Sequence, residues 1–392
     1  MKKLLLILLC LPFIGFGQNW ETTIGGGNED WGYSVEQTSD GGYIVCGFTE
    51  SSGNGGRDVY LIKTDDNGVE QWSKTFGGNQ DDFGNSVLQT SDGGYIVCGY
   101  TESFGNGSRD VYLIKTDSNG NQQWDQTFGG SHYDIGESIK QTSDGGYIIT
   151  GMRYDVSADV YLIKTDNNGH LEWSKTFDEG STDLGYEVEQ TTDGGYIIAG
   201  STNSTITNGD NDVYLIKTDS NGNQQWKKKF GGTGVDRGHS VQQTIFGRYI
   251  VCGYTGGGDL WLIKTDGNGD QQWSQTFGGI GDDKGHSVQQ TTDGGFIICG
   301  ETESFGDSSG SYIIYSRNVY LIKTDGNGNQ EWYQTFGGID YDEGRSVQQT
   351  TDGGYIICGH TYSYGNGMGD VYLIKTDGNG NVTSTFNIPI NP

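Results

Sequence analysis

The chain has 392 residues, with 51 acidic and only 23 basic side chains, which gives a formal net charge of −28 at pH 7. A surface this acidic repels nucleic acid and anionic lipid, so we expect neither as a partner. The 69 glycines and three prolines favour many tight turns over long helices.

The first 17 residues are typical of a secretion signal. Two lysines precede the apolar run LLLILLCLPFIGF, and Gly17 is a small residue at the expected cleavage site ahead of Gln18. The run is too short to span a bilayer comfortably, and no later segment is apolar enough to cross one. Cys10 lies inside the apolar run without a small residue before it, so lipidation is the weaker interpretation. The mature chain is expected to be secreted or exposed at the cell surface, without membrane insertion.

A unit of about 52 residues is repeated seven times after this signal. Each unit reads W-x-x-T-F-G-G, D-x-G-x-S-V-x-Q-T, D-G-G-Y-I-I-C-G-x-T, a variable stretch, and D-V-Y-L-I-K-T-D-x-N-G-N. Only one segment is badly eroded, at residues 246–249, where FGRY replaces DGGY. The repeated tryptophan falls at Trp20, Trp72, Trp124, Trp173, Trp226, Trp273 and Trp332.

Each unit contains four strand signals separated by turn residues, which we label a (SVxQT), b (YIICGxT), c (VYLIKTD) and d (xxWxxTF). Segments b and c are apolar at nearly every position, which predicts burial on both faces, as between stacked sheets. Residues 18–381 are therefore expected to form one all-β domain, a seven-bladed β-propeller of four-stranded antiparallel blades. A tail at 382–392 follows it.

The two ends of the repeat distinguish a closed ring from an open solenoid. After the signal the chain begins with a segment d, WETTI at 20–24, and its last complete strand signal is a segment c. The first segment can therefore complete the last blade and close the ring. The tail segment VTSTF at 382–386 competes for the same edge, but it lacks the tryptophan.

The segments DGGYIVCGYT at 92–101 and KTDSNGNQQWDQTFGG at 115–130 resemble the repeats of secreted bacterial β-propeller proteins. The resemblance extends over nearly all of residues 20–381. It implies the propeller architecture and export from the cell, and it implies no particular activity. Many such proteins carry a C-terminal sorting domain, which we do not expect in this sequence.

The stretch DSNGN at 117–121 has the alternating oxygen side chains of a calcium loop. Its glycine is the fourth residue instead of the sixth, however, and its twelfth residue is Phe128 instead of glutamate. Asn-Gly is also a strong hairpin signal, and all seven units keep it. We interpret it as a two-residue turn that places Lys115 opposite Trp124, with the lysine stem over the indole. Calcium is the weaker alternative, and no other cofactor is expected.

Two further positions are nearly constant. One slot in segment b requires a small buried side chain, so we expect its cysteines to be packed free thiols. This slot holds Cys46, Cys98, Thr150, Ala199, Cys252, Cys299 and Cys358. The aspartate of D-x-G is expected to bind amides of its own loop, and a ring of carboxylates around a cation is the alternative. It falls at Asp30, Asp82, Asp134, Asp183, Asp236, Asp283 and Asp342.

The repeats differ on one face of the expected disc. The a–b and c–d turns share the face that is nearly identical in all units, whereas the b–c and d–a loops share a variable face, where we place function. Aromatic residues there suit sugar rings or a protein partner. The residue after D-x-G also varies, and we expect it near the mouth of the central channel. The candidate ligand-binding residues are Trp31, Tyr33, Phe83, Tyr133, Glu137, Tyr186, His239, His286, Tyr341 and Arg345.

The sequence favours a monomeric binding protein that recognises a glycan or a protein through this face. The alternatives are a glycoside hydrolase of endoglucanase type, with Glu137, Glu187 and the D-x-G aspartates as candidate carboxylates, and a passive adhesive disc. No G-x-S-x-G, HExxH or cysteine–histidine motif points to another enzyme class, so no catalytic residue is assigned. His239 and His286 occupy equivalent positions and suggest a metal pair, but their shared place in the repeat explains the match more simply.

Overall fold

The computed structural model describes residues 19–203, 210–305 and 316–385. The expected signal peptide, including Cys10, and residues 386–392 of the tail lie outside the described residues. Every regular element in the described ranges is a β-strand. None of these ranges contains a helix long and apolar enough to cross a membrane.

The strands occur in sets of four that match segments a to d. The innermost strands are β2 (Asp30–Gln37), β6 (Asp82–Gln89), β10 (Asp134–Gln141), β14 (Thr182–Gln190), β18 (Arg237–Gln243), β22 (Asp283–Gln290) and β26 (Asp342–Gln349). The second are β3 (Tyr43–Thr49), β7 (Tyr95–Thr101), β11 (Tyr147–Tyr154), β15 (Tyr196–Asn203), β19 (Tyr249–Tyr254), β23 (Phe296–Thr302) and β27 (Tyr355–Thr361). The third are β4 (Asp58–Thr64), β8 (Asp110–Thr116), β12 (Ala158–Thr165), β16 (Asp212–Thr218), β20 (Leu260–Thr265), β24 (Asn318–Thr324) and β28 (Asp370–Thr376). The outermost are β1 (Trp20–Ile24), β5 (Glu70–Phe76), β9 (Gln122–Phe128), β13 (Leu171–Phe177), β17 (Gln224–Phe230), β21 (Gln271–Phe277) and β25 (Gln330–Phe336).

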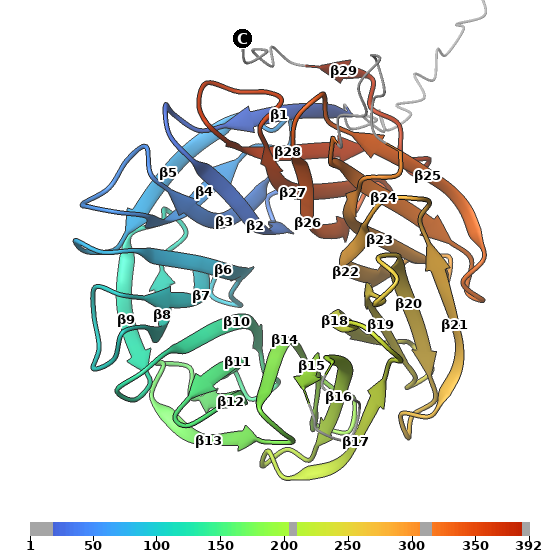
Figure 1. The fold of residues 1–392 in the computed structure, drawn as a ribbon. Coiled ribbons are helices and arrows are strands. Elements are labelled where there is room, and N and C mark those ends of the chain that lie inside the picture. The colour runs from blue at the N-terminus through green and yellow to red at the C-terminus, as the bar shows by residue number, and fades with distance from the viewer. Residues whose placement is uncertain (1–18, 204–209, 306–315, 386–392) are drawn as a thin grey trace, which may run out of the picture.

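The four-stranded antiparallel sheets stand around a common centre, with segment a innermost and segment d at the periphery (Figure 1). This is the arrangement of a β-propeller. Two of the sets are joined into an eight-stranded sheet by the parallel pair Ala158–Thr182. Segments b and c are buried at nearly every residue, as their apolar sequences predict, because neighbouring sheets cover both of their faces.

The expected clasp strand completes the last set of four strands. Strand β1 pairs antiparallel with β28, from Trp20–Lys375 to Ile24–Val371, although more than 340 residues separate them in the chain. The tail does not displace it. Instead, the short strand β29 (Ser384–Thr385) pairs in parallel with the outer side of β1 (Figure 1).

The DSNGN segment forms a turn, although not the two-residue turn that we expected. The amide of Asp117 donates to the carbonyl of Asn121, so the loop between them has three residues. Gly120 has a φ of 75°, and the Asp117 carboxylate accepts the amides of Asn119 and Asn121 at 2.9 Å. The register skips Gln123, and this bulge restores the expected pairing of Lys115 with Trp124.

The same turn contacts the neighbouring unit. A β-carbon at Gly120 would collide with the indole of Trp72, which belongs to the preceding unit. The equivalent glycine and tryptophan meet in the same way in the other units, including Gly68 with Trp20. Glycine is therefore required here for two reasons, its positive φ and the tryptophan packed on it.

The expected placement of the lysine over the indole is wrong in most units. Lys115 is buried, and its ammonium lies 3.0 Å from the carboxylate of Asp92 in the DGG turn. Although burial alone would raise it, hydrogen bonds from Thr90, Gly94 and Lys115 lower the pKa of Asp92 to about 2. Burying an ammonium requires a partner of this kind, which explains why DGG and VYLIK occur together. The other pairs are Lys63–Asp40, Lys164–Asp144, Lys217–Asp193, Lys323–Asp293 and Lys375–Asp352.

The eroded unit lacks this ion pair. Phe246 replaces the aspartate, and Arg248 replaces a glycine whose equivalents face the buried lysine directly. Lys264 donates instead to the carbonyl of Gly326 at 2.9 Å, and its ammonium lies 5.5 Å from the ring centre of Trp273. Phe246 is left 77% exposed, so it contributes little to the core.

We expect the double variant Phe246→Asp, Arg248→Gly to raise the free energy of unfolding by about 1 kcal/mol, because it restores a hydrogen-bonded ion pair to Lys264. Urea unfolding measures the gain. The pKa of the new carboxyl should be lowered, as it is at Asp92, so the gain should persist above about pH 4. It should disappear as the pH falls toward about 2. An equal gain from Arg248→Gly alone would contradict the ion-pair explanation.

Candidate functional site

A β-bulge interrupts the innermost strand of every unit at the same place. In β2 the pairing with β3 shifts between Gly32 and Ser34, so Tyr33 has no partner in the ladder. Bulges of this kind redirect a side chain out of the regular alternation. The bulged residues are Tyr33, Asn85, Glu137, Tyr186, His239, His286 and Arg345.

Contact between units explains why a glycine precedes each bulge. A β-carbon at Gly32 would collide with the Cys358 thiol of the neighbouring sheet, and one at Gly136 would collide with the Cys98 thiol. The small slot and the D-x-G glycine therefore face each other in four units, at Gly32, Gly136, Gly185 and Gly344, whereas Gly84, Gly238 and Gly285 face a valine or leucine of the neighbouring third strand. All five described cysteines are buried and free, which confirms the expectation of packed thiols within the described ranges.

All seven bulged side chains line one cavity of about 440 Å³ along the centre of the propeller, which we call the channel. This confirms that they gather at one place. The other lining residues come from the remainder of the same strands, down to the glutamine of SVxQT. Neighbouring bulged side chains also contact one another. Asn85 donates to Glu137 at 3.2 Å, Tyr186 stacks on His239, and the guanidinium of Arg345 lies 5.8 Å from the ring centre of Tyr33.

Four of the ten candidate residues do not line the channel. Trp31 and Phe83 lie inside β2 and β6, not in exposed loops as expected. Trp31 stacks on His360 with ring centres 4.0 Å apart, and Phe83 is buried. Tyr133 and Tyr341 do lie in exposed loops, at 46% and 51% exposure, so they belong to the outer rim.

A second variable layer lies two residues before each bulge, nearer to the variable loops. It consists of the middle residue of D-x-G and the residue opposite it on the second strand. The pairs are Trp31–Phe48, Phe83–Tyr100, Ile135–Met152, Leu184–Ser201, Arg237–Tyr254, Lys284–Glu301 and Glu343–His360. The layer therefore changes from aromatic through aliphatic to charged along the succession of units. Sequence reasoning missed it, although the two positions vary together from unit to unit.

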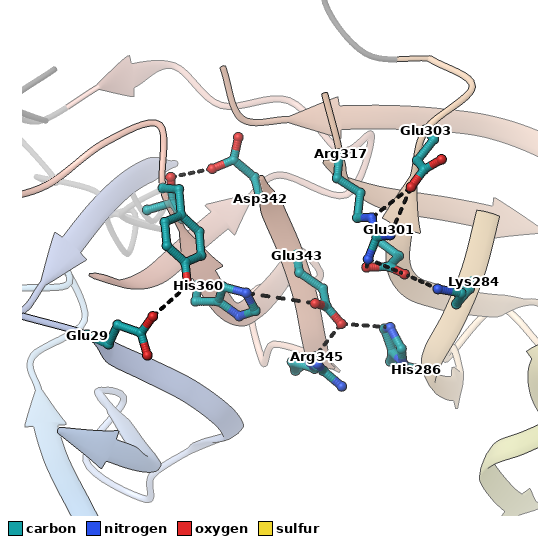
Figure 2. Close-up of polar contacts among 12 residues, drawn as sticks. Glu29, Lys284, His286, Glu301, Glu303, Arg317, Asp342, Glu343, Arg345 and His360 are labelled. Carbon is teal, nitrogen blue, oxygen red and sulfur yellow. Dashed lines mark hydrogen bonds and ion pairs between the residues drawn. The ribbon is translucent and has the colours of Figure 1, made fainter. Parts of the chain in front are cut away.

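The charged part of this layer is centred on Glu343 (Figure 2). Its carboxylate lies 2.9 Å from Nε2 of His286 and 2.8 Å from Nε of Arg345. Although burial alone would raise it, Arg345 and His286 hold the pKa of Glu343 well below its usual range. Burial lowers the pKa of His360, 3.8 Å away, to about 4. Glu343 is therefore ionised at neutral pH and His360 is neutral.

The histidine pair does meet, but not as the metal site considered above. The two Nδ1 atoms of His239 and His286 are 3.0 Å apart, whereas Asp236 and Asp283 bind their own loops. His286, Glu301 and Glu343 instead form a group of three possible ligands, whose atoms lie within 4.8 Å of one another. Lysine and arginine side chains already neutralise both carboxylates: Arg345 at Glu343, and Lys284 and Arg317 at Glu301. This group is therefore better explained as an ion-pair network than as a metal site.

The D-x-G aspartates bind backbone amides of their own loops. Each accepts the amide four residues earlier, at 2.6–3.0 Å. The donors are Gly26, Gly78, Gly130, Glu179, Gly232, Gly279 and Gly338. These bonds account for one oxygen of each carboxylate, whereas Oδ1 of Asp30, Asp82, Asp134 and Asp183 is buried without a hydrogen-bond partner in the described ranges, so a role in binding calcium stays a hypothesis.

Deeper in the channel, beyond the bulges, four charged residues line the wall: Glu36, Lys140, Glu187 and Glu189. Lys140 pairs with Glu187 at 3.3 Å, and its side chain is 43% exposed to the channel. Burial raises the pKa of Glu36, and it raises the pKa of Glu189 to about 7. Burial likewise raises the pKa of Glu137, at the bulge, to about 7. The channel therefore holds several carboxylates that are poorly compensated.

Comparison with known proteins supports the fold alone. No family model matches the chain, and no curated protein matches its sequence. Among solved structures, the WD40 domain of Pan2 from Neurospora crassa is similar, with a TM-score of 0.55 and 10% identity, over 94% of this chain and 98% of that one. A protein of unknown function from Dyadobacter fermentans has a TM-score of 0.50 and 11% identity, over 91% of this chain and 97% of that one. The protein is thus a β-propeller, and its site must be argued from its own residues.

We expect Glu343→Gln to lower the free energy of unfolding by about 1–3 kcal/mol, because the half-buried guanidinium of Arg345 would lose the counter-charge of a carboxylate that is only 11% exposed. Glu50→Gln provides the control. It breaks an ion pair of similar length, 2.7 Å to Arg57, between side chains that are about one-third exposed, so we expect a loss of about 0–1 kcal/mol. Urea unfolding of both variants gives the comparison. Equal losses of unfolding free energy would show that the lower exposure of Glu343 does not strengthen its ion pairs.

Proposed function

We propose that the chain is a closed seven-bladed propeller, exported from the cell, whose channel mouth and variable face bind a ligand. Support for closure comes from contacts that repeat around the ring and also join the last unit to the first. The hydroxyl of Ser346 accepts the amide of Val35 at 3.3 Å, as Ser34 accepts that of Val87. The side chain of Gln37 accepts the amide of Thr351 at 2.9 Å, as Gln89 accepts that of Ser39.

Closure makes a direct prediction for Ser346→Ala. In a closed ring this variant should lower the free energy of unfolding by about 0.5–1.5 kcal/mol, because the amide of Val35 loses its acceptor. Ser34→Ala, which removes the same contact between the first two units, should have a matching effect. Urea unfolding of the two variants is the measurement. A loss with Ser34→Ala but none with Ser346→Ala would indicate an open arrangement.

One observation carries the binding function. The scaffold positions are nearly identical in all units, whereas the bulged positions that face the channel present tyrosine, asparagine, glutamate, histidine and arginine. Folding does not require this variety, because all seven units form the same bulge although five residue types occupy it. A non-identical ring of polar and aromatic side chains around a cavity is what recognition of one particular ligand requires. We propose a glycan or a protein as the ligand, with Tyr133 and Tyr341 as exposed contacts at the rim.

A glycoside hydrolase is the second candidate. Glu137 favours it, because a carboxyl with a pKa near 7 suits a general acid. Glu187 does not support the pairing, since its carboxylate accepts the amide of Val241 and binds Lys140. The other six units have serine at that position, so Glu187 takes over a structural contact. Binding without turnover is therefore the better supported function, and a passive disc leaves the variable mouth unexplained.

The experiment is a binding screen of the mature chain on a glycan array and against candidate proteins, with a turnover assay on each hit. We expect retention without turnover. The double variant Tyr33→Asn, Tyr186→Asn should weaken binding by about tenfold or more, since stacking and hydrogen bonds at the mouth are lost. Asparagine already occupies the same bulge at Asn85, so the variant should fold.

Val69→Thr is the matched control, because Val69 is 62% exposed on the c–d turns of the opposite face. It should bind as the wild type does. Binding that is unchanged in the Tyr33, Tyr186 variant would remove the mouth as the site. Turnover that is lost in Glu137→Gln would establish the hydrolase instead.

A further inference from the structure

Three carboxylates in the channel form no direct ion pair. Glu36, Glu137 and Glu189 line the same cavity, and none of them forms an ion pair with any residue in the described ranges. The lysine and the arginine that line the cavity contact other carboxylates: Lys140 pairs with Glu187 at 3.3 Å, and Arg345 pairs with Glu343 at 2.8 Å. The attraction of Lys140 for Glu36 and Glu189, and of Arg345 for Glu137, does not offset burial, which keeps the pKa values of these three carboxyls raised. The channel wall therefore has an excess of carboxylates, with four glutamates against one lysine and one arginine.

The repeat itself shows that folding does not need two of these charges. The carboxylate of Glu36 accepts the amide of Gln89 at 2.6 Å, and that of Glu189 accepts the amide of Gln243. In the last three units a neutral glutamine performs the same task. The side chains of Gln242, Gln289 and Gln348 accept the equivalent amides of Gln290, Gln349 and Gln37 at 2.5–2.6 Å.

Keeping a carboxylate where glutamine suffices costs free energy, because the partly desolvated channel disfavours the charged form. The raised pKa values of Glu36 and Glu189 reflect this cost. Glu137 at the mouth carries the same cost. Among the described residues only Asn85 donates a hydrogen bond to its side chain, and burial raises its pKa. A ligand that supplies positive charge would offset this cost.

The spacing of these groups argues against a single metal ion. Among the described residues, the groups close enough to share an ion include none of these three carboxylates; they are His286, Glu301 and Glu343, and Asp159, Asp178 and Asp183. Glu36 and Glu189 lie three residues beyond the bulge position that Glu137 occupies, which corresponds to about 7–10 Å along the channel. An elongated organic cation can reach both levels, whereas one ion cannot.

We propose that the channel binds an alkylammonium group, carried by a linear polyamine or by a lysine side chain, with Glu137 at the mouth and Glu36 and Glu189 deeper. This inference rests on the proposed function and names the chemistry of its ligand. The wall already holds a primary ammonium, Lys140 against Glu187, and a guanidinium, Arg345 over Tyr33. Nε2 of His239, a lining residue, is buried without a hydrogen-bond partner in the part of the chain that the structure describes, which leaves a polar atom for the ligand to satisfy.

The test is calorimetric titration of the mature chain at physiological ionic strength with two probes. One probe is spermidine, and the other is a blocked pentapeptide with a single lysine. The two arms distinguish a free polyamine from a lysine side chain. We expect at least one probe to bind the wild type, and the triple variant Glu36→Gln, Glu137→Gln, Glu189→Gln to bind it about tenfold or more weakly.

Glu70→Gln is the control, because Glu70 is an exposed carboxylate at the start of an outermost strand, outside the channel. It should bind as the wild type does. Equal weakening by Glu70→Gln would mean that the overall acidity of the surface attracts the amine, and the proposal would fall. If the triple variant fails to fold, Glu36→Gln and Glu137→Gln singly, with unchanged melting temperatures, carry the same comparison.

Two outcomes separate this inference from the proposed function. If the wild type binds a glycan through the mouth but neither amine, the cation site is wrong and the binding function stands. If an amine binds but the Tyr33→Asn, Tyr186→Asn variant leaves all glycan and protein binding unchanged, the mouth is not the recognition site and the cation site stands by itself. Failure of both probes to bind the wild type overturns the inference.

Discussion

Close packing of consecutive innermost strands is the constraint on which the rest of the structure depends. The D-x-G glycine faces the small slot of the neighbouring sheet in four units and an aliphatic side chain of that sheet's third strand in the other three, with little room for a β-carbon in any of them. This contact brings each strand against the next, within reach of the serine and glutamine bonds that join the units. The bulge follows directly after the glycine, so the residue that the scaffold does not use faces the channel. Scaffold and site are thus specified by adjacent positions of one short motif.

Much of the fold could be predicted, because its determinants repeat at a fixed period. The four strands of each unit, the clasp at Trp20, the free thiols and the gathering of the seven bulged residues all follow from patterns within one unit. The errors arose where contacts join distant segments. Lys115 was assigned to Trp124 because the hairpin places them opposite each other, yet its charge pairs with Asp92, on another turn. The prediction of a two-residue turn was also wrong. The loop has three residues, but the bulge at Gln123 gives the same pairing of Lys115 with Trp124, so the strand pattern could not distinguish the two turns.

The candidate site could be predicted only in part, for a similar reason. Position relative to D-x-G identified the residues that line the channel, but it misplaced Trp31 and Phe83, which lie inside strands where neighbouring rings cover them. The network of Glu343 was missed because it joins side chains of two neighbouring sheets. Glu36 and Glu189 were overlooked because they stand where other units have glutamine, and only the hydrogen bonds show that glutamine performs the same task.

The eroded turn has a consequence for the packing between units. Six units bury a lysine against an aspartate of their own turn, whereas in the unit of Phe246 the equivalent Lys264 donates to the carbonyl of Gly326 in the next unit. A contact that stabilises one unit internally is thus exchanged for one that joins two units. These two units also contribute His239 and His286 to the channel, so the exchange ties together the part of the wall where the two imidazoles meet.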